Sequence, residues 1–310
     1  MDYVYLNARI RAKEEELLTN SDYDKLINAP SYESALNMLL EKGYKTVDGH
    51  LDIDGRRKSL SEPLFEALPD FILHIFRLDK DFYNIKLAIK AEYTGRDIKE
   101  LLSNGGNIDK DILYESIINR AYEGVPNYIK QTAENAFMML EKYENIQLME
   151  IVTDNALQHC KIKLAKEIGD IKLCEYLSLC TDIKNIKTVL RIIYSKSDIS
   201  LLKYAISEGG RLSADLIIRS ASFSAEVFIE YIKSNGFILE NADRDLEKQC
   251  DDIIMHYLKS MRYDVFSILP SVLYMEAIDT ECKNVQIILL GKKNGAKTGE
   301  NRERIRDTYV

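Results

Sequence analysis

The chain has 310 residues, which is enough for about two domains of ordinary size, each with its own core. Its 46% hydrophobic and 30% charged residues are typical of a globular protein and exclude a disordered or fibrous one. The net charge of −8 argues against a general nucleic-acid binder, because neutralising phosphates requires a basic surface.

The low content of turn residues indicates the fold class. The chain has 14 glycines and 5 prolines, too few for a sandwich or barrel of many short strands. We therefore predict an all-α fold. No stretch approaches the roughly 18 apolar residues of a transmembrane helix, and the charged N-terminus lacks the apolar segment of a signal peptide.

Apolar residues follow helical spacing from the N-terminal region onward. Residues 24–30 are typical of the end of a short helix closed by a proline, and residues 31–42 form a helix pattern with a serine start and a glycine stop. Residues 45–59 are the most loop-like, and their two Asp-Gly pairs favour a small hairpin.

Helical spacing resumes at Leu60 and continues to Arg77, with interruptions expected at Pro63 and Pro69. Long helices joined by short turns are predicted after that, with no Pro/Ser-rich linker between them. The predicted spans are 81–93, 111–122, 127–143, 146–169, 171–194, 214–234, 243–260 and 270–290.

An internal repeat is the most informative feature of the sequence. Three segments, DFYNIKLAIK, DIKNIKTVLR and ECKNVQIILL, share an acidic residue, an asparagine three positions later and an apolar run. The asparagines are 101 and 99 residues apart, and self-similarity at a fixed period indicates repeated structural units. We predict three similar helical domains, over residues 1–110, 111–212 and 213–310. The motif residues are Asp81 and Asn84, Asp182 and Asn185, and Glu281 and Asn284.

Further matches flank the motif. Downstream, the pair Gly105–Gly106 matches Gly209–Gly210 after a three-residue shift. Upstream, Asp154 matches Asp251, at an offset of 97 residues. Matches on both sides of the motif indicate that the repeat extends over whole domains.

Each motif asparagine begins an apolar stripe at spacings i, i+3, i+4 and i+7, so we expect it to be buried. A buried amide without partners costs about 1–3 kcal/mol and should therefore bond to the backbone or to a nearby side chain. We interpret the asparagines as packing residues that set how helices register. A polar row lining a channel between the repeats is the functional alternative.

Residues for catalysis or metal binding are not apparent in the sequence. The four histidines form no cluster, and zinc, nucleotide-binding and nucleophile-elbow motifs do not occur. We predict a non-enzyme with no cofactor, no metal and no small-molecule substrate. The cysteines show no C-x-x-C spacing and are expected to be reduced thiols in helical cores. They are Cys160, Cys174, Cys180, Cys250 and Cys282.

The C-terminal segment 291–310 is basic on an acidic protein, with six cations against three acids. It is either an interaction patch for an acidic partner or a set of cations favoured by the C-terminal dipole of the preceding helix. The six residues are Lys292, Lys293, Lys297, Arg302, Arg304 and Arg306.

Taken in order, several segments resemble the C-subunit family of V-type (A-type) ATPases and ATP synthases, whose eukaryotic counterpart is called the d subunit. The resemblance is carried by YVYLNARIRAKEEELL, DFYNIKLAIKAEYTG and DIKNIKTVLR, and by the ending ECKNVQIILLGKKNG…RERIRDTYV. It extends over the entire chain, including the three-fold repetition. Residues 45–62 fit the family pattern least well.

The resemblance implies a funnel of three similar helical domains with pseudo-three-fold symmetry. It further implies a non-catalytic rotor subunit on the cytoplasmic face of the cell membrane, a socket that couples the central-stalk subunits to the membrane rotor ring of proteolipid subunits during rotary ion transport. A generic helical scaffold outside the ATPase is the alternative. It would equally lack catalytic, metal-binding and nucleotide-binding motifs, and it differs only in its partner.

Overall fold

The computed structural model describes residues 3–240 and 245–309. The described residues are 73% helical, and their strands are the two-residue β1 (Thr46–Val47) and β2 (His50–Leu51). The predicted all-α class is confirmed. No helix among the described residues is both long and apolar enough to cross a membrane.

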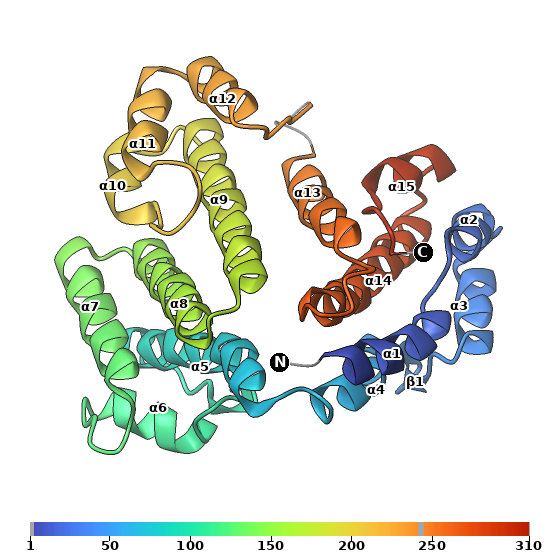
Figure 1. Ribbon diagram of the computed structural model, residues 1–310, viewed down its shortest axis with the longest axis horizontal. Helices are drawn as coiled ribbons and strands as arrows, with labels where there is room; N and C mark the ends of the chain where they lie inside the picture. Colours follow the sequence, from blue (N-terminus) through green and yellow to red (C-terminus); the bar gives the residue numbers. More distant parts are fainter. Residues whose placement is uncertain (1–2, 241–244, 310) are drawn as a thin grey trace. The chain divides into compact units, whose positions relative to one another are not determined.

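The described residues divide into two compact units. The terminal unit contains those of 1–68 and 240–310, and the central unit contains residues 69–239. In Figure 1 the central unit runs from the light-blue α5 to the orange α12.

The terminal unit is built around the 25-residue helix α14 (Leu269–Lys293), which packs against helices from both ends of the sequence. Its core joins side chains such as Ile27 and Leu39 to Val285 and Ile288, so N-terminal and C-terminal segments share one hydrophobic core. The other helices of the unit are α1 (Val4–Lys13), α2 (Asn20–Asn28), α3 (Tyr32–Glu41), α4 (Ile53–Phe65), α13 (Leu246–Ser260) and α15 (Thr298–Arg304), with a 3₁₀ turn at Glu14–Glu16.

The central unit is built around α8 (Ile146–Ile168), which packs against α5, α7, α9 and α10. Phe82, Ile117, Ile129 and Met149 are among its fully buried core side chains. The surrounding helices are α5 (Asp70–Thr94), α6 (Lys110–Ile118), α7 (Asn127–Tyr143), α9 (Ile171–Tyr194), α10 (Leu202–Ala205), α11 (Ala214–Phe223) and α12 (Ala225–Ser234), with 3₁₀ turns at Lys99–Leu101 and Ile199–Leu201.

Several predicted helix boundaries are confirmed. They can be predicted because the residues that cap a helix lie next to it in the sequence. Helix α8 ends at Gly169, whose φ of 77° is the left-handed C-cap conformation, and Asp170 caps α9 by accepting from the amide of Leu173. The hairpin between β1 and β2 also forms. Its turn residues Asp48 and Gly49 have φ of 51° and 79°, as a type I′ turn requires.

The interpretation of residues 45–59 as the most loop-like stretch fails beyond the hairpin, because α4 begins at Ile53. The second Asp-Gly pair, Asp54–Gly55, lies in the first turn of α4, where the carboxylate of Asp52 accepts from the Gly55 amide at 2.8 Å. Pro63 does not interrupt this helix either. It lies in the last turn of α4, where a missing N–H removes one intrahelical bond.

Other expectations also need correction. The span 214–234 is two helices, because Ser224 adopts an extended backbone between α11 and α12. The helix predicted at 111–122 ends at Ile118, before Arg120 with its positive φ of 51°. Residues 243 and 244, at the start of another predicted helix, lie outside the described residues. The segment 291–310 contains α15, which the charge pattern does not predict.

The break at Ser224 yields a stability prediction. Its side-chain hydroxyl accepts from the amide of Val227 and caps α12, so Ser224→Ala should lower the free energy of unfolding by about 1 kcal/mol. Urea unfolding of the purified chain measures the change. Ser222→Ala is the matched control, because this exposed hydroxyl bonds within α11, and it should stay within about 0.5 kcal/mol of wild type. Equal effects of the two substitutions would contradict the capping role.

Candidate functional site

The three motif asparagines are fully buried, as their apolar spacing indicates, and each pairs with both backbone groups of one later residue. Asn185 donates to the carbonyl of Ser207 at 2.8 Å and accepts from the amide of the same residue at 2.8 Å. Asn84 pairs in the same way with Ser103, at 2.9 and 2.8 Å. We call this two-bond arrangement the asparagine clamp.

The third clamp has the same geometry. Asn284 of α14 donates to the Arg306 carbonyl at 3.0 Å and accepts from its amide at 2.8 Å. In all three cases the clamped residue lies about 20 residues after the asparagine, in a segment that returns alongside the long helix. Each clamp therefore fixes a returning segment to the helix that precedes it.

The acidic residues of the first two motifs hold the same returning segments at a second point. Asp182 accepts from the amides of Arg211 and Leu212 at 2.9 and 3.0 Å. Asp81 accepts likewise from the amides of Asn107 and Ile108, at 3.1 and 3.2 Å. Burial raises the pKa of both aspartates above the ordinary value, and the amide bonds partly offset that shift.

The repeated glycine pairs have a physical explanation in this contact. A Cβ at Gly106 would collide with the carboxylate of Asp81, and a Cβ at Gly210 would collide with that of Asp182. The preceding glycines have φ of 84° and 98°, which other residues rarely adopt. The match between the two Gly-Gly pairs thus reflects the same close approach of backbone to carboxylate.

The third acidic residue is used differently. Glu281 accepts from the backbone amide of Leu18 at 2.6 Å and from the hydroxyl of Tyr44 at 2.8 Å. It also lies 3.4 Å from Nε of Arg56, which is buried as well. Instead of holding its own returning segment, Glu281 ties α14 to the N-terminal part of the terminal unit.

Sequence reasoning missed a further asparagine with a similar function. Asn7 of α1 is 2% exposed, and its side-chain amide donates to the carbonyls of Val265 and Ser267 at 2.9 Å each. It fixes the connection between α13 and α14. Its position within the N-terminal YVYLNARIR is a weak signal, since the segment matches none of the three repeated motifs.

Lysines and acids form a polar seam between α5, α8 and α9 of the central unit. Lys86 pairs with Asp154 at 2.8 Å, and Lys90 pairs with Glu150. Lys184 of α9 donates to Asn155 at 3.0 Å. Burial lowers the pKa of Lys184 to about 8, and the charges of Lys86 and Lys161 act in the same direction, while Asp154 opposes them. In the terminal unit Asp251, which matches Asp154 in the repeat, accepts from Lys283 at 3.2 Å.

Part of the basic segment 291–310 is used within the terminal unit. Lys292, in the last turn of α14, donates to the carbonyls of Ile27 and Ala29 at the end of α2. Arg302 of α15 lies 2.8 Å from the carboxylate of Asp24. These contacts attach the C-terminal segment to α2, as the dipole interpretation of Lys292 allows.

The remaining cations of this segment differ in their environment. Arg306 lies 3.3 Å from Asp251 and is half-buried. Lys293, Lys297 and Arg304 are exposed, and none of them pairs with a carboxylate in the described part of the chain. The six predicted cations thus divide into three that pair internally and three that face solvent.

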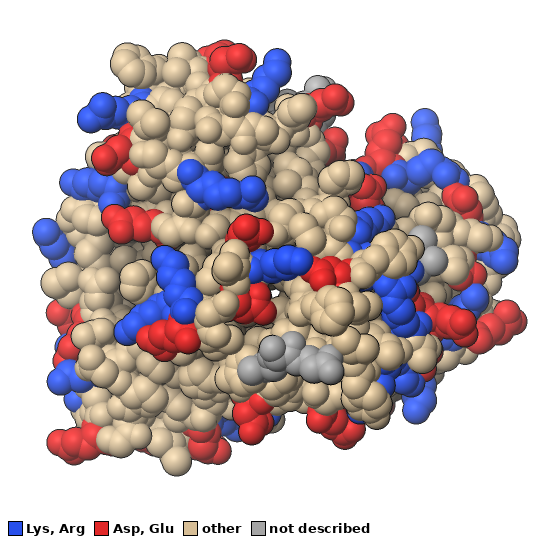
Figure 2. Space-filling view, in the orientation of Figure 1, with Lys and Arg blue, Asp and Glu red and all other residues tan. Residues whose placement is uncertain are grey.

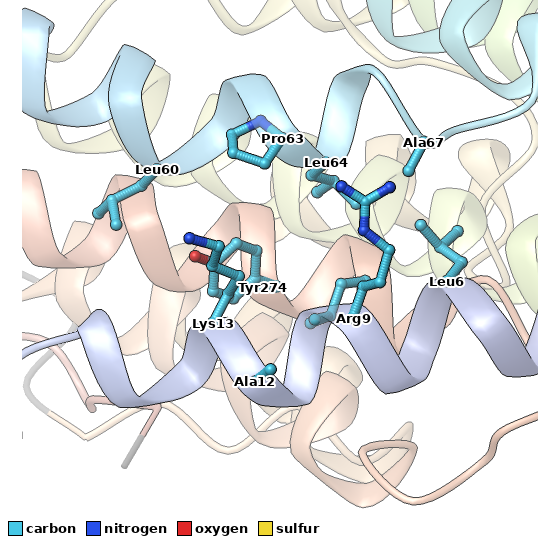
Figure 3. A pocket seen from close by; sticks show the side chains of 10 residues that line it. Leu6, Arg9, Ala12, Lys13, Leu60, Pro63, Leu64, Ala67 and Tyr274 are labelled. Atoms are coloured by element: carbon cyan, nitrogen blue, oxygen red, sulfur yellow. The ribbon is translucent and has the colours of Figure 1, made fainter.

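A cavity of about 190 Å³ lies between α1, α4 and α14. Leu60 and Leu64 supply apolar walls, and Figure 3 shows Arg9 reaching from α1 toward Leu64. The hydroxyl of Tyr274 is buried without a hydrogen-bond partner among the described residues. The space is similar to that of cavities that hold a single aromatic ring.

Charged side chains of both signs are interspersed over the face seen in Figure 2, without a large area of one sign. No group of three or more His, Cys, Asp or Glu side chains with metal-binding geometry occurs within residues 3–240 and 245–309. The repeated polar contacts of the three motifs join side chains to backbone groups.

Long helices tied to returning segments by buried side chains form a structural, all-helical protein. The chain belongs to the ATP synthase (C/AC39) subunit family, whose sequence profile matches residues 6–304. Members of this family are structural rather than catalytic subunits.

Curated relatives match over most or all of their length. The chain is 22% identical to the C subunit of the V-type sodium ATPase of Enterococcus hirae, with coverage of 100% of this chain and 99% of the relative. It is 24% identical to the C subunit of the A-type ATP synthase of Haloferax volcanii, over 94% and 93% of the two chains. The C subunit of the V-type ATP synthase of Thermus thermophilus is 24% identical over 62% of this chain and 63% of its own.

The clamps yield a second stability prediction. Asn185→Ala leaves the amide and carbonyl of Ser207 buried without partners, and should lower the free energy of unfolding by about 2–4 kcal/mol. Asn84→Ala should cost less, because Ser103 is partly exposed. Asn119→Ala, at an exposed end of α6, is the control and should change stability by less than about 0.5 kcal/mol. Denaturant unfolding would contradict the clamp if Asn185→Ala and Asn119→Ala gave the same midpoint.

The half-buried Lys184 yields a pH-dependent prediction. Below pH 8 Lys184 is charged in both states, so the folded state bears the full cost of burying the charge. Between pH 8 and the ordinary lysine value of 10.5 the folded state releases the proton first, and wild-type stability rises with pH. Lys184→Met should therefore stabilise the protein by about 1–3 kcal/mol at pH 7, and this gain should vanish towards pH 10.5.

Thermal unfolding of wild type and Lys184→Met across this pH range measures the effect. Lys163→Met, at an exposed position on α8, is the matched control and should show no such trend. A gain that stays constant from pH 7 to pH 10.5 would show that Lys184 is not destabilised by burial of its charge.

Proposed function

We propose that this chain is a non-catalytic rotor subunit of a V/A-type rotary ATPase or ATP synthase. In this role it is a socket between the central stalk and the membrane rotor ring, and it passes rotation from one to the other during ion transport. The observation that carries the proposal is the end-to-end match to a relative named as the C subunit of a V-type sodium ATPase, at 100% and 99% coverage. Because both chains match along their full length, the likeness is not confined to one shared domain.

The contacts suit transmission of torque. A socket must not yield at its loops, and in this chain the segments that follow the three long helices α5, α9 and α14 are fixed by asparagine clamps. Each clamp forms two hydrogen bonds from one side chain, and asparagine has few rotamers. The backbone that it holds therefore has little freedom to move under load. Buried partners also keep water from competing for these bonds.

We further propose that the chain comprises three similar domains, residues 1–110, 111–212 and 213–310, arranged as a funnel with pseudo-three-fold symmetry. The recurrence of the clamp about every 100 residues supports this division. Both internal boundaries fall directly after a returning segment held by an aspartate, Asp81 in one case and Asp182 in the other. The packing of α5 on α8, of α9 on α12 and of α14 on α4 supports an arrangement in which each long helix contacts a helix of the next domain in cyclic order.

The proposed partners are the central-stalk subunits and the proteolipid rotor ring, with the chain on the cytoplasmic face of the cell membrane as a peripheral subunit. Lys293, Lys297 and Arg304 are the part of the basic segment that could pair with acidic groups of a partner, since they face solvent. Their use as an interaction patch is part of the proposal. A generic helical scaffold remains the competing function, and it would bind none of these ATPase subunits.

Purification of the assembly from membranes tests the proposal. A tagged copy of the chain, expressed in its own cells and extracted in mild detergent, should recover stalk and ring subunits in fixed ratio and with ATPase activity. The isolated chain should hydrolyse no nucleotide. Recovery of the chain as a partner-free monomer would contradict the rotor function, and nucleotide hydrolysis by the purified chain would contradict its non-catalytic role.

A further inference from the structure

The connection between α13 and α14, residues 261–268, exposes large apolar side chains. Tyr263 and Phe266 are 73% and 74% exposed, and Val265 is exposed beside them. Val4 of α1, one turn before Asn7, is exposed on the same side of that helix. Single exposed apolar residues are common on proteins, but three within the four residues 263–266 are less so.

The backbone of this connection is held in place by hydrogen bonds to Asn7 and within the connection itself. The buried amide of Asn7 donates to the carbonyls of Val265 and Ser267, on either side of Phe266. The Phe266 amide donates to the carboxylate of Asp264 at 3.3 Å, and the Ser267 hydroxyl accepts from the Leu269 amide at 3.1 Å. A fixed backbone limits the positions that the aromatic side chains can take, which lowers the entropy lost when they bind.

Arg11 places a positive charge beside Tyr263. Arg11 donates to the carbonyl of Arg262 at 3.0 Å, and its guanidinium lies 4.7 Å from the ring centroid of Tyr263. Arg11 pairs with no carboxylate within the described part of the chain, whereas Arg262 pairs with Glu14. Arg11 is thus an unpaired cation at the edge of these apolar side chains, on a protein of net charge −8.

The composition matches the centre of a protein interface. Aromatic residues and arginine are enriched at such centres, and truncation of these residues often accounts for most of the binding energy. A membrane surface fits less well, since the chain has no tryptophan and its net negative charge opposes anionic lipid. The exposed aromatic pair and the unpaired Arg11 favour a protein that brings carboxylates.

We propose that Val4, Arg11, Tyr263, Val265 and Phe266, which we call the aromatic patch, form a docking surface for a protein partner. The partner presents apolar side chains edged by carboxylates, which meet the aromatic side chains and Arg11 respectively. This inference rests on the proposed function, because the partner is taken to be a component of the rotary ATPase. It assigns the contact to a defined surface of the terminal unit.

The test compares two variants of the full chain in the assembled complex. Tyr263→Ser/Phe266→Ser removes both aromatic side chains from the patch. Phe223→Ser is the matched control, because Phe223 is 80% exposed at the end of α11 and lies outside the patch. Each tagged chain is purified from solubilised membranes, and its affinity is measured by titration against the ATPase complex depleted of this subunit.

The double variant should bind the depleted complex at least about 30-fold more weakly than wild type, as expected for the loss of interface hot spots. The control should bind within about twofold of wild type, and both variants should keep the wild-type melting temperature because the altered side chains are exposed. Wild-type affinity of the double variant would overturn the inference. Failure of wild type itself to bind would instead contradict the proposed function.

Vesicle flotation separates a protein partner from a membrane surface. The purified chain is mixed with vesicles of phosphatidylcholine and phosphatidylglycerol and centrifuged through a density gradient. Wild type and the double variant should both remain at the bottom. Flotation of wild type that the double variant loses would assign the patch to lipid and overturn the protein-docking inference.

Discussion

The architecture depends on one interaction, in which a buried side-chain amide pairs with both backbone groups of a single distant residue. Long helices have a clear reason to form, because their apolar faces bury against neighbours. The segments that return along them are largely irregular, so their backbone groups need other partners. The asparagine clamp supplies the missing constraint. Asn185 satisfies the amide and carbonyl of Ser207 in an interior where water cannot do so. The same solution at Asn84 and Asn284 gives three long helices the same relation to the segments that follow them.

The aspartate that accompanies two of the clamps determines where glycine is required. Because the carboxylate of Asp81 lies against the backbone at Gly106, no side chain fits there, and the same holds for Asp182 and Gly210. In the third motif a longer acid, Glu281, reaches the N-terminal region of the chain instead and pairs there with Leu18, Tyr44 and Arg56. The substitution of Glu for Asp thus accompanies a change from a contact within one repeat to a contact between the two ends of the sequence. That contact helps to hold the terminal unit together.

Periodicity predicts much of this fold, and the exceptions have local causes. Helices α7 and α9 match their predicted spans to the residue, because helical apolar spacing runs through both and the sequence marks their starts, with Pro126 before α7 and Asp170 before α9. The first turn of α4 escapes prediction because its Asp-Gly pair is also a turn signal, and only the three-dimensional position of the Asp52 cap distinguishes the two uses. The break at Ser224 has no proline or glycine to mark it.

Part of the candidate site can also be predicted from the sequence, because its motif is repeated. Repetition identifies the motif residues, but not their partners about 20 residues later, which are Ser103, Ser207 and Arg306. The clamp binds only backbone groups, so it requires no particular side chain at these positions. Asn7 and the aromatic patch are not repeated, so no comparison within the chain could reveal them.

Family membership and the repeated clamp together support a rigid coupling subunit. Electron cryomicroscopy of the intact ATPase from the source membranes tests this most directly. The chain is expected to lie between the central stalk and the ring and to rotate with them, and a position outside the rotor would contradict its coupling role.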